Sequence, residues 1–186
     1  MVFGNKKLIF DGTGVGGGII VDGKLMNGAH GSGGELGHMV LDPKETAVCG
    51  CGKRGCVEQY CSATGIVRMA KLALEASDED SALRRLSNLT CKDIFDAGKQ
   101  GDQLALQVLD KYYAYMGEFL ADVCCVVNPE VVVLGGGVSK AGDFLLNAVR
   151  EEVPHYLLYK NIPAARIELA KLGADAGIIG AAFLGI

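Results

Sequence analysis

Glycine is concentrated in one part of this chain, and that concentration limits what the backbone can form there. The sequence has 27 glycines in 186 residues, and fourteen of them lie between Gly12 and Gly55. They follow no Gly-X-Y repeat, so a collagen-like helix is excluded. Because glycine lacks a Cβ atom, such a stretch favours tight turns and close approach of the backbone to a ligand. We therefore expect residues 12–55 to wrap around a bound group.

The remaining composition is that of a soluble folded protein. Hydrophobic residues make up 49% of the chain and charged residues 22%, which excludes wholesale disorder. The formal net charge is −4, and no basic face for nucleic acid is evident. The first ten residues lack the apolar run of a secretory signal, and no apolar stretch is long enough to span a membrane. We expect a cytoplasmic protein that binds neither nucleic acid nor membranes.

Hydrophobic patterning predicts an α/β fold in which a helical block separates two units, each made of a strand and a glycine turn. In chain order, the pattern predicts strands at 7–10 and 18–21, an irregular segment over about 28–60, a helical block over about 62–127, a strand and turn at 130–137, a helix at about 141–152, a strand at 166–172 and a closing small-residue helix. No linker divides the chain, so residues 1–186 are expected to form one unit.

Two glycine turns have the composition of nucleotide-binding loops. Residues 12–18, GTGVGGG, let backbone N–H groups converge on an anion, and Thr13 adds a hydroxyl. The segment is neither a Walker A loop nor a Rossmann fingerprint, because no Gly-Lys-Ser/Thr follows and a strand replaces the expected helix. The second turn, Gly135 to Gly137, follows a buried strand. Each turn alone is also compatible with a plain connection, but together they can line one nucleotide crevice.

Three of the seven cysteines are crowded into the segment Cys49-Gly-Cys51-Gly-Lys-Arg-Gly-Cys56. This spacing is typical of a zinc site. The glycines between the cysteines offer little apolar surface to bury unrelated thiols, which is the alternative. His38, eleven residues before Cys49, is a candidate for the fourth ligand.

Two carboxylates flank the cysteine segment. Glu35 precedes His38 in the string Glu-Leu-Gly-His, and Glu58 follows Cys56 by two residues. If His38 binds a metal, Glu58 is held near it, and both carboxylates and the imidazole can then converge on a polar ligand such as a sugar. The alternative for both carboxylates is a solvated loop charge.

Taken together, the motifs resemble the ROK family of sugar kinases and repressors (repressor, open reading frame, kinase), and within it the bacterial glucokinases. The resemblance is carried by the strings GTGVGGGIIVDGKL, GSGGELGHM, CGCGKRGCVEQYCSATG, NPEVVVLGGGVS and GADAGIIGAA. It implies one lobe of the actin-like/hexokinase (ribonuclease H-like) ATPase fold, the C-terminal one. The family's N-terminal lobe carries another phosphate loop and the Asp that acts as general base. No catalytic base is therefore expected in these 186 residues.

The resemblance also implies roles for individual residues. It implies a structural Zn²⁺ held by His38, Cys49, Cys51 and Cys56, and sugar contacts from Glu35, His38 and Glu58. One His38 nitrogen would face the zinc and the other the sugar. It implies Mg-ATP as phosphoryl donor, bound by Gly12, Thr13, Gly14, Gly135, Gly136 and Gly137. Family members usually dimerise, so a homo-oligomer is expected.

The expected function is phosphorylation of a hexose, glucose in the first place, by ATP at the 6-hydroxyl, with the isolated chain inactive for lack of the base. Two alternatives are a sugar-sensing ROK repressor, with its DNA-binding part upstream, and a zinc-stabilised module without catalysis. One residue departs from the family pattern: Asp11 stands before Gly-Thr-Gly, where an apolar residue is usual. It is either a replacement base or a solvated charge in an altered segment.

Overall fold

The computed structural model describes residues 7–11, 14–158, 160–161 and 164–171. Its sheet has the order β3-β2-β1-β4-β5. The strands are β1 (Lys7–Asp11), β2 (Gly16–Val21), β3 (Lys24–Leu25), β4 (Val131–Leu134) and β5 (Arg166–Leu169). β1, β2 and β3 pair antiparallel, whereas β4 runs parallel to both β1 and β5. The α/β prediction is confirmed. The predicted closing helix lies outside the described residues.

A tight hairpin turn joins β2 to β3, as the Asp-Gly pair predicts. Asp22 and Gly23 both have positive φ, 51° and 78°. This combination is the signature of a type I′ turn, whose twist matches that of the flanking strands. The glycine-rich start of β2 pairs with the end of β1. It therefore lies at the end of β2 opposite the hairpin turn.

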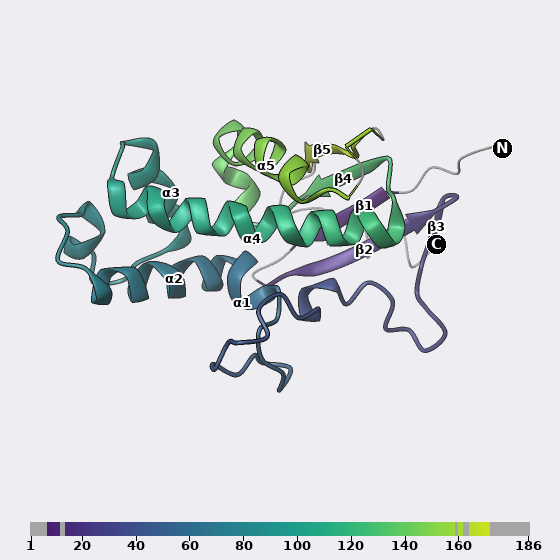
Figure 1. The fold of residues 1–186 in the computed structure, drawn as a ribbon, viewed down its shortest axis with the longest axis horizontal. Coiled ribbons are helices and arrows are strands. Elements are labelled where there is room, and N and C mark those ends of the chain that lie inside the picture. Colours follow the sequence, from purple (N-terminus) through teal and green to yellow (C-terminus); the bar gives the residue numbers. More distant parts are fainter. Residues whose placement is uncertain (1–6, 12–13, 159, 162–163, 172–186) are drawn as a thin grey trace.

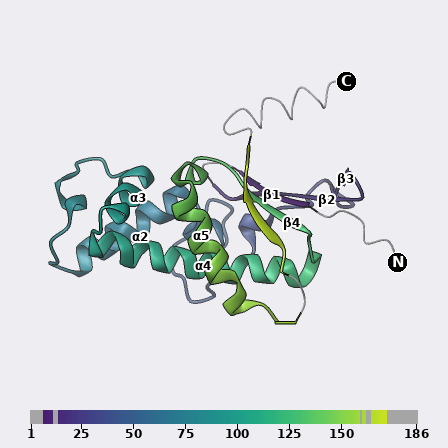
Figure 2. The ribbon, with the colours of Figure 1, turned by 90° about the horizontal axis from the view of Figure 1, so that it is seen from above.

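The helices form a block beside the sheet, with α4 as its spine (Figure 1). They are α1 (Glu58–Cys61), α2 (Ala63–Ala76), α3 (Cys91–Lys99), α4 (Gln103–Val127) and α5 (Asp143–Tyr156). One end of α4 runs along the sheet, and its other end extends beyond the sheet to pack against α2 and α3. Figure 2 shows α5 crossing α4 on the same side of the sheet. Residues 82–85, which we expected to continue a helix, form a short 3-10 turn. Among the described residues, no helix has the length and apolarity needed to cross a membrane.

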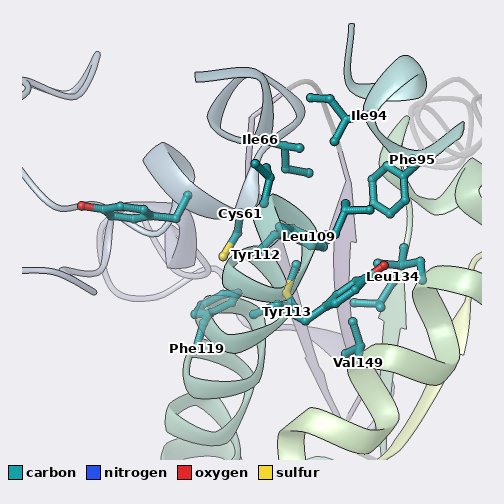
Figure 3. Close-up of a cluster of buried hydrophobic side chains, with 14 of the residues drawn as sticks. Cys61, Ile66, Ile94, Phe95, Leu109, Tyr112, Tyr113, Phe119, Leu134 and Val149 are labelled. Atoms are coloured by element: carbon teal, nitrogen blue, oxygen red, sulfur yellow. The ribbon is translucent and has the colours of Figure 1, made fainter. Parts of the chain in front are cut away.

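The hydrophobic core fills the space between α4, its neighbouring helices and the sheet (Figure 3). Leu109 and Tyr112 of α4 are almost completely buried at its centre. The Phe95 ring of α3 meets the Tyr112 ring edge-on, with centroids 6.2 Å apart. Leu134 at the end of β4 joins the same cluster. The core therefore fixes the end of β4, and with it the glycine turn that follows.

A partly buried hydrogen-bond network holds the N-terminal end of α4. Asp102 caps α4 by accepting the Ala105 N–H at 3.0 Å. The same carboxylate accepts the Ser81 hydroxyl at 2.9 Å and the Ala82 N–H at 2.8 Å. Burial opposes its ionisation, but these donors outweigh burial and lower the pKa of Asp102 below its usual range. One carboxylate thus holds both the start of α4 and the 3-10 turn of residues 82–85.

Replacing Asp102 with alanine should destabilise the protein by roughly 1–3 kcal/mol. The change removes a helix cap and leaves the buried Ser81 hydroxyl without its acceptor. Denaturant unfolding measures the loss, with Asp110→Asn on an exposed position of the same helix as the control for loss of a charge. A loss no larger than that of the control would contradict the network's importance.

The Asp102 contribution should also depend on pH in a defined direction. Its pKa is lower in the folded protein than its ordinary value of 3.8. The stabilisation is therefore complete above that ordinary value and is lost as the pH falls through the folded-state pKa. We expect the difference in unfolding free energy between wild type and Asp102→Asn to be constant near pH 6–7 and to shrink below about pH 4. A difference that grows on acidification would have the wrong sign.

Candidate functional site

The segment between β3 and α1 is irregular and folds back on itself beneath the sheet, along the lower edge of Figure 1. Two isolated bridges, Val40 with Cys56 and Val48 with Arg54, pair its first arm (residues 40–49) with its second arm (residues 51–56). Gly55 has φ +70°, and a Cβ atom there would overlap the Asp42 carbonyl. Here the glycine is required by a close crossing of backbone on backbone, whereas the composition led us to expect tight turns and close approach to a ligand.

The four predicted metal ligands meet in this segment. The ligand atoms of His38, Cys49, Cys51 and Cys56 all lie within 4.8 Å of one another. Cys49 Sγ is 3.8 Å from His38 Nδ1, and Cys51 Sγ is 3.6 Å from Cys56 Sγ. Ligand atoms around a tetrahedral zinc with Zn–S bonds of about 2.3 Å are separated by roughly 3.8 Å. The donor set and its spacing therefore fit a zinc ion.

The thiols of this cluster differ in their surroundings. Cys49 and Cys56 are buried, and Cys51 is exposed. Burial raises the pKa of the Cys56 thiol to about 12. A hydrogen bond from the Lys53 backbone, with the nearby Lys53 charge in support, lowers the pKa of Cys51. A metal bound here has to displace the proton of at least one buried thiol, so its affinity would fall with acid.

The imidazole of His38 is held at the end of a short 3-10 turn, Leu36–His38. The backbone carbonyl of His38 accepts a hydrogen bond from the Lys53 ammonium at 2.7 Å. A histidine that offers one ring nitrogen to a metal keeps the other for a second partner, and the metal then fixes the orientation of the ring. The geometry brings His38 Nδ1 to the cysteines.

Glu58, the first residue of α1, connects the metal ligands to the glycine loop. Its Oε2 accepts the Val15 N–H at 3.1 Å, and its Oε1 lies 3.9 Å from the Cys49 sulfur. A Cβ atom on Gly14 would overlap Oε2. A Cβ atom on Gly37 would likewise overlap the Val15 carbonyl. The end of the glycine loop thus packs directly onto the segment that carries the metal ligands, although 43 residues separate Val15 from Glu58.

The second predicted carboxylate lies apart from this contact. Glu35 is exposed and begins the 3-10 turn that carries His38, without capping it through its side chain. Within the described part of the chain its carboxylate forms no hydrogen bond or ion pair.

Gly14 of the first glycine turn and Gly135 of the second border one cavity. Cys61, Tyr112 and Leu134 also line this cavity. Gly136 has φ +71°, which favours glycine, and its carbonyl accepts the Ser139 hydroxyl at 2.7 Å. Gly12 and Thr13 fall outside the described residues. Asp11 ends β1, paired with Gly16.

A cluster of side chains anchors the segment that carries the metal ligands to the helices. No sequence pattern indicates this cluster. Glu45 accepts a hydrogen bond from the Tyr60 hydroxyl at 2.8 Å and pairs with Arg68 at 2.7 Å. These partners stand 15 and 23 residues away in the chain. Glu45 lies in a loop without periodicity, so nothing in the sequence distinguishes it from a solvated charge.

Comparison with known proteins gives one consistent result. The model of the ROK family matches residues 8–186. A glucokinase of Halalkalibacterium halodurans is 42% identical over 183 residues, which are 97% of this chain and 56% of that protein. A glucokinase of Thermotoga maritima is 36% identical over 92% of this chain and 55% of its own length.

Among solved structures, the chain is similar to a ROK family glucokinase from Streptomyces griseus in complex with glucose and AMPPNP. The TM-score is 0.89 and the sequence identity 34%, over 97% of this chain and 60% of that one. The chain thus spans little more than half the length of the relatives it matches. The fold agrees with the actin-like/hexokinase fold expected of ROK sugar kinases. Because the ROK family model matches nearly the whole length of this chain, the chain belongs to the ROK family.

Proposed function

We propose that this chain is the sugar- and nucleotide-binding lobe of an ATP-dependent hexose 6-phosphotransferase, with glucose as its sugar. The observation that carries the proposal is the Glu58 carboxylate. It touches both the Val15 N–H at the end of the glycine loop and the cysteine cluster around His38. A sugar beside Glu58 and His38 would therefore lie next to the loop proposed to face the ATP phosphates. Adjacency of the two substrates is the main requirement of phosphoryl transfer, whose catalysis is largely positioning and charge stabilisation.

The side chains of the metal segment would bind and orient the sugar. Glu35 and Glu58 offer carboxylate acceptors to its hydroxyls, and His38 offers the ring nitrogen that does not face the cysteines. A zinc ion held by His38, Cys49, Cys51 and Cys56 would fix the shape of residues 38–56, and it would orient His38 rather than act on phosphate.

The reaction needs groups beyond these. The sugar 6-oxygen would form a bond to the γ-phosphorus while the bond between that phosphorus and the leaving ADP oxygen breaks. The proton of the 6-hydroxyl would pass to a carboxylate base in the family's N-terminal lobe. Gly12, Thr13 and Gly14 would face the ATP phosphates, with Mg²⁺, and Gly135, Gly136 and Gly137 would lie beside the adenosine. We accordingly propose that the 186 residues bind both substrates but turn them over poorly by themselves.

The sugar site can be tested by calorimetric titration of glucose into the chain. Glu58→Ala and His38→Ala should each weaken glucose roughly 10- to 100-fold, because a hydrogen bond to a charged group contributes about 1.5–3 kcal/mol. His155→Ala, on the exposed face of α5, is the matched control and should bind as wild type. Mannose, fructose and an N-acetylated hexosamine, titrated in parallel, test the choice of glucose. Equal affinity of all three variants would contradict the assignment of the site.

A glycine exchange tests the contact between the loop and Glu58. In Gly14→Ala the new methyl group would push the Glu58 carboxylate away from Val15, so sugar affinity should fall although the change is on the nucleotide side. In Gly18→Ala the new methyl group would meet, among the described side chains, only Leu25 Cδ1 at an ordinary 3.8 Å, so glucose affinity should be retained. The two variants are compared by the same titration, and similar affinities would count against the contact.

The proposal that the base lies in the family's N-terminal lobe gives a kinetic prediction. A coupled assay of glucose phosphorylation should show little or no turnover by the 186-residue chain, even at saturating ATP. A turnover number in the usual enzyme range of about 1–10³ s⁻¹ would contradict it. In that event Asp11→Asn would show whether Asp11 serves as the base.

Zinc can be tested separately from catalysis. Elemental analysis should find one zinc per chain, and its removal by a chelator should lower the melting temperature by several degrees, because metal binding is coupled to folding of residues 38–56. Cys56→Ser should lose most of the bound metal. No change in melting temperature after verified removal would argue against a structural zinc.

A further inference from the structure

The Glu45 carboxylate is saturated with hydrogen-bond donors from two parts of the fold. Its Oε1 accepts the N–H groups of Thr46 and Ala47, each at 2.9 Å. Its Oε2 accepts the Tyr60 hydroxyl and the Arg68 guanidinium at 2.8 and 2.7 Å. Only 12% of this side chain is exposed. The Ala47 N–H, followed by Tyr60 and Arg68, outweighs burial and lowers the pKa of Glu45 to about 2. The group is thus a fixed anion near neutral pH.

These bonds lead directly to the arms that carry two metal ligands. Ala47, whose N–H is bound by Glu45, stands two residues before Cys49. The Ala47 backbone carbonyl accepts the Gln59 side-chain amide at 3.0 Å, and the side-chain oxygen Oε1 of Gln59 accepts the Cys56 N–H at 3.1 Å. One short chain of hydrogen bonds therefore runs from Glu45 through both arms to Cys56.

The other end of this chain rests on packed helices. Tyr60 is 4% exposed, and its ring lies 4.3 Å, centroid to centroid, from the ring of Tyr115 on α4. The Arg68 guanidinium of α2 lies over the Tyr60 ring, 5.4 Å from its centroid. Arg68 also donates to the Gln59 carbonyl at 3.3 Å. The anchor of the loop therefore rests on Tyr60, which belongs to the core, and on Arg68, which packs over it.

We propose that Glu45, together with Tyr60 and Arg68, is a positioning cluster for the metal site: it holds the arm that carries Cys49 against α2 and so raises zinc affinity. The proposal rests on the metal site of the proposed function. Residues 39–55 have little regular structure, and ordering a free loop around an ion would reduce the affinity by the cost of that ordering. Groups behind the ligands that fix their geometry typically change metal affinity 10- to 100-fold when mutated. None of the three residues belongs to the predicted ligands.

Zinc affinity measured in competition with a chromophoric chelator tests the cluster. Glu45→Gln and Arg68→Met should each weaken zinc about 10-fold or more. The double variant should be little worse than either single change, because the pair acts as a unit. Arg68→Lys should recover part of what Arg68→Met loses, since an ammonium can still pair with Glu45. A general loss of packing would not be recovered in this way.

The control is a second Glu–Arg pair of this chain. Glu130 and Arg166 pair at 3.1 Å on an exposed surface at the start of β4 and β5. Glu130→Gln and Arg166→Met should change zinc affinity less than twofold. Circular dichroism of each zinc-free variant checks its fold. Glu45→Gln leaves a guanidinium whose Nε is already buried without a partner among the described residues, so it is the variant most at risk of misfolding. If it misfolds, Tyr60→Phe, which removes only one hydroxyl, decides the question by a several-fold loss.

The outcomes separate this inference from the proposed function. Tight zinc binding by wild type, with unchanged affinity in the cluster variants, would overturn the inference and leave the metal site standing. Equal losses in the cluster and control variants would overturn it as well. Absence of zinc from well-folded wild type would overturn both the metal site and the cluster's role. A loss confined to the cluster variants, with partial recovery by Arg68→Lys, supports the inference.

Discussion

The carboxylate of Glu58 is the contact on which the site depends. Its bond to the Val15 N–H joins the glycine loop at the start of β2 to the first turn of α1, and its other oxygen lies beside the cysteine cluster. Three segments that are far apart in the chain meet at this one group. Two glycines make the meeting possible, because a side chain at Gly14 would displace the carboxylate and one at Gly37 would strike the Val15 carbonyl. The glycine excess of residues 12–55 thus reflects backbone packed onto backbone as well as any contact with a ligand.

Around this contact, two connected sets of interactions shape the irregular segment. One is the set of four ligand atoms within 4.8 Å of one another, which a metal ion can tie together. The other is the Glu45 anchor, which fastens the same segment to α1 and α2. In the helical block, α4 packs against α2, α3 and α5, and much of it is buried. A loop with little secondary structure of its own therefore acquires a defined shape from its neighbours, and a functional loop needs such support to hold side chains at fixed distances.

The sequence predicts this molecule well wherever local chemistry dominates. Asp22-Gly23 requires a type I′ turn, the Val-rich run before Gly135 requires a buried strand, and both are present. The spacing of Cys49, Cys51 and Cys56 and the choice of His38 agree with one cluster in space. Long-range polar contacts could not be predicted. Nothing near Glu45 or Glu58 identifies Arg68 or the Val15 N–H as partners, because these pairs are created by the packing of helices against the sheet. The expectation that residues 82–85 continue a helix was wrong. Despite their helical composition they form a 3-10 turn, which Asp102 holds through the Ala82 N–H.

The central claim is that one site joins a metal-held sugar pocket to the nucleotide loop. Diffraction at the zinc absorption edge, from crystals of this chain grown with glucose, tests it most directly. The account predicts one anomalous peak about 2.3 Å from three sulfurs and about 2.0 Å from a His38 nitrogen. It also predicts glucose within hydrogen-bond distance of Glu58 and His38, with Val15 N–H still bound to Glu58. Glucose bound elsewhere, or a metal outside the cysteine cluster, would contradict it.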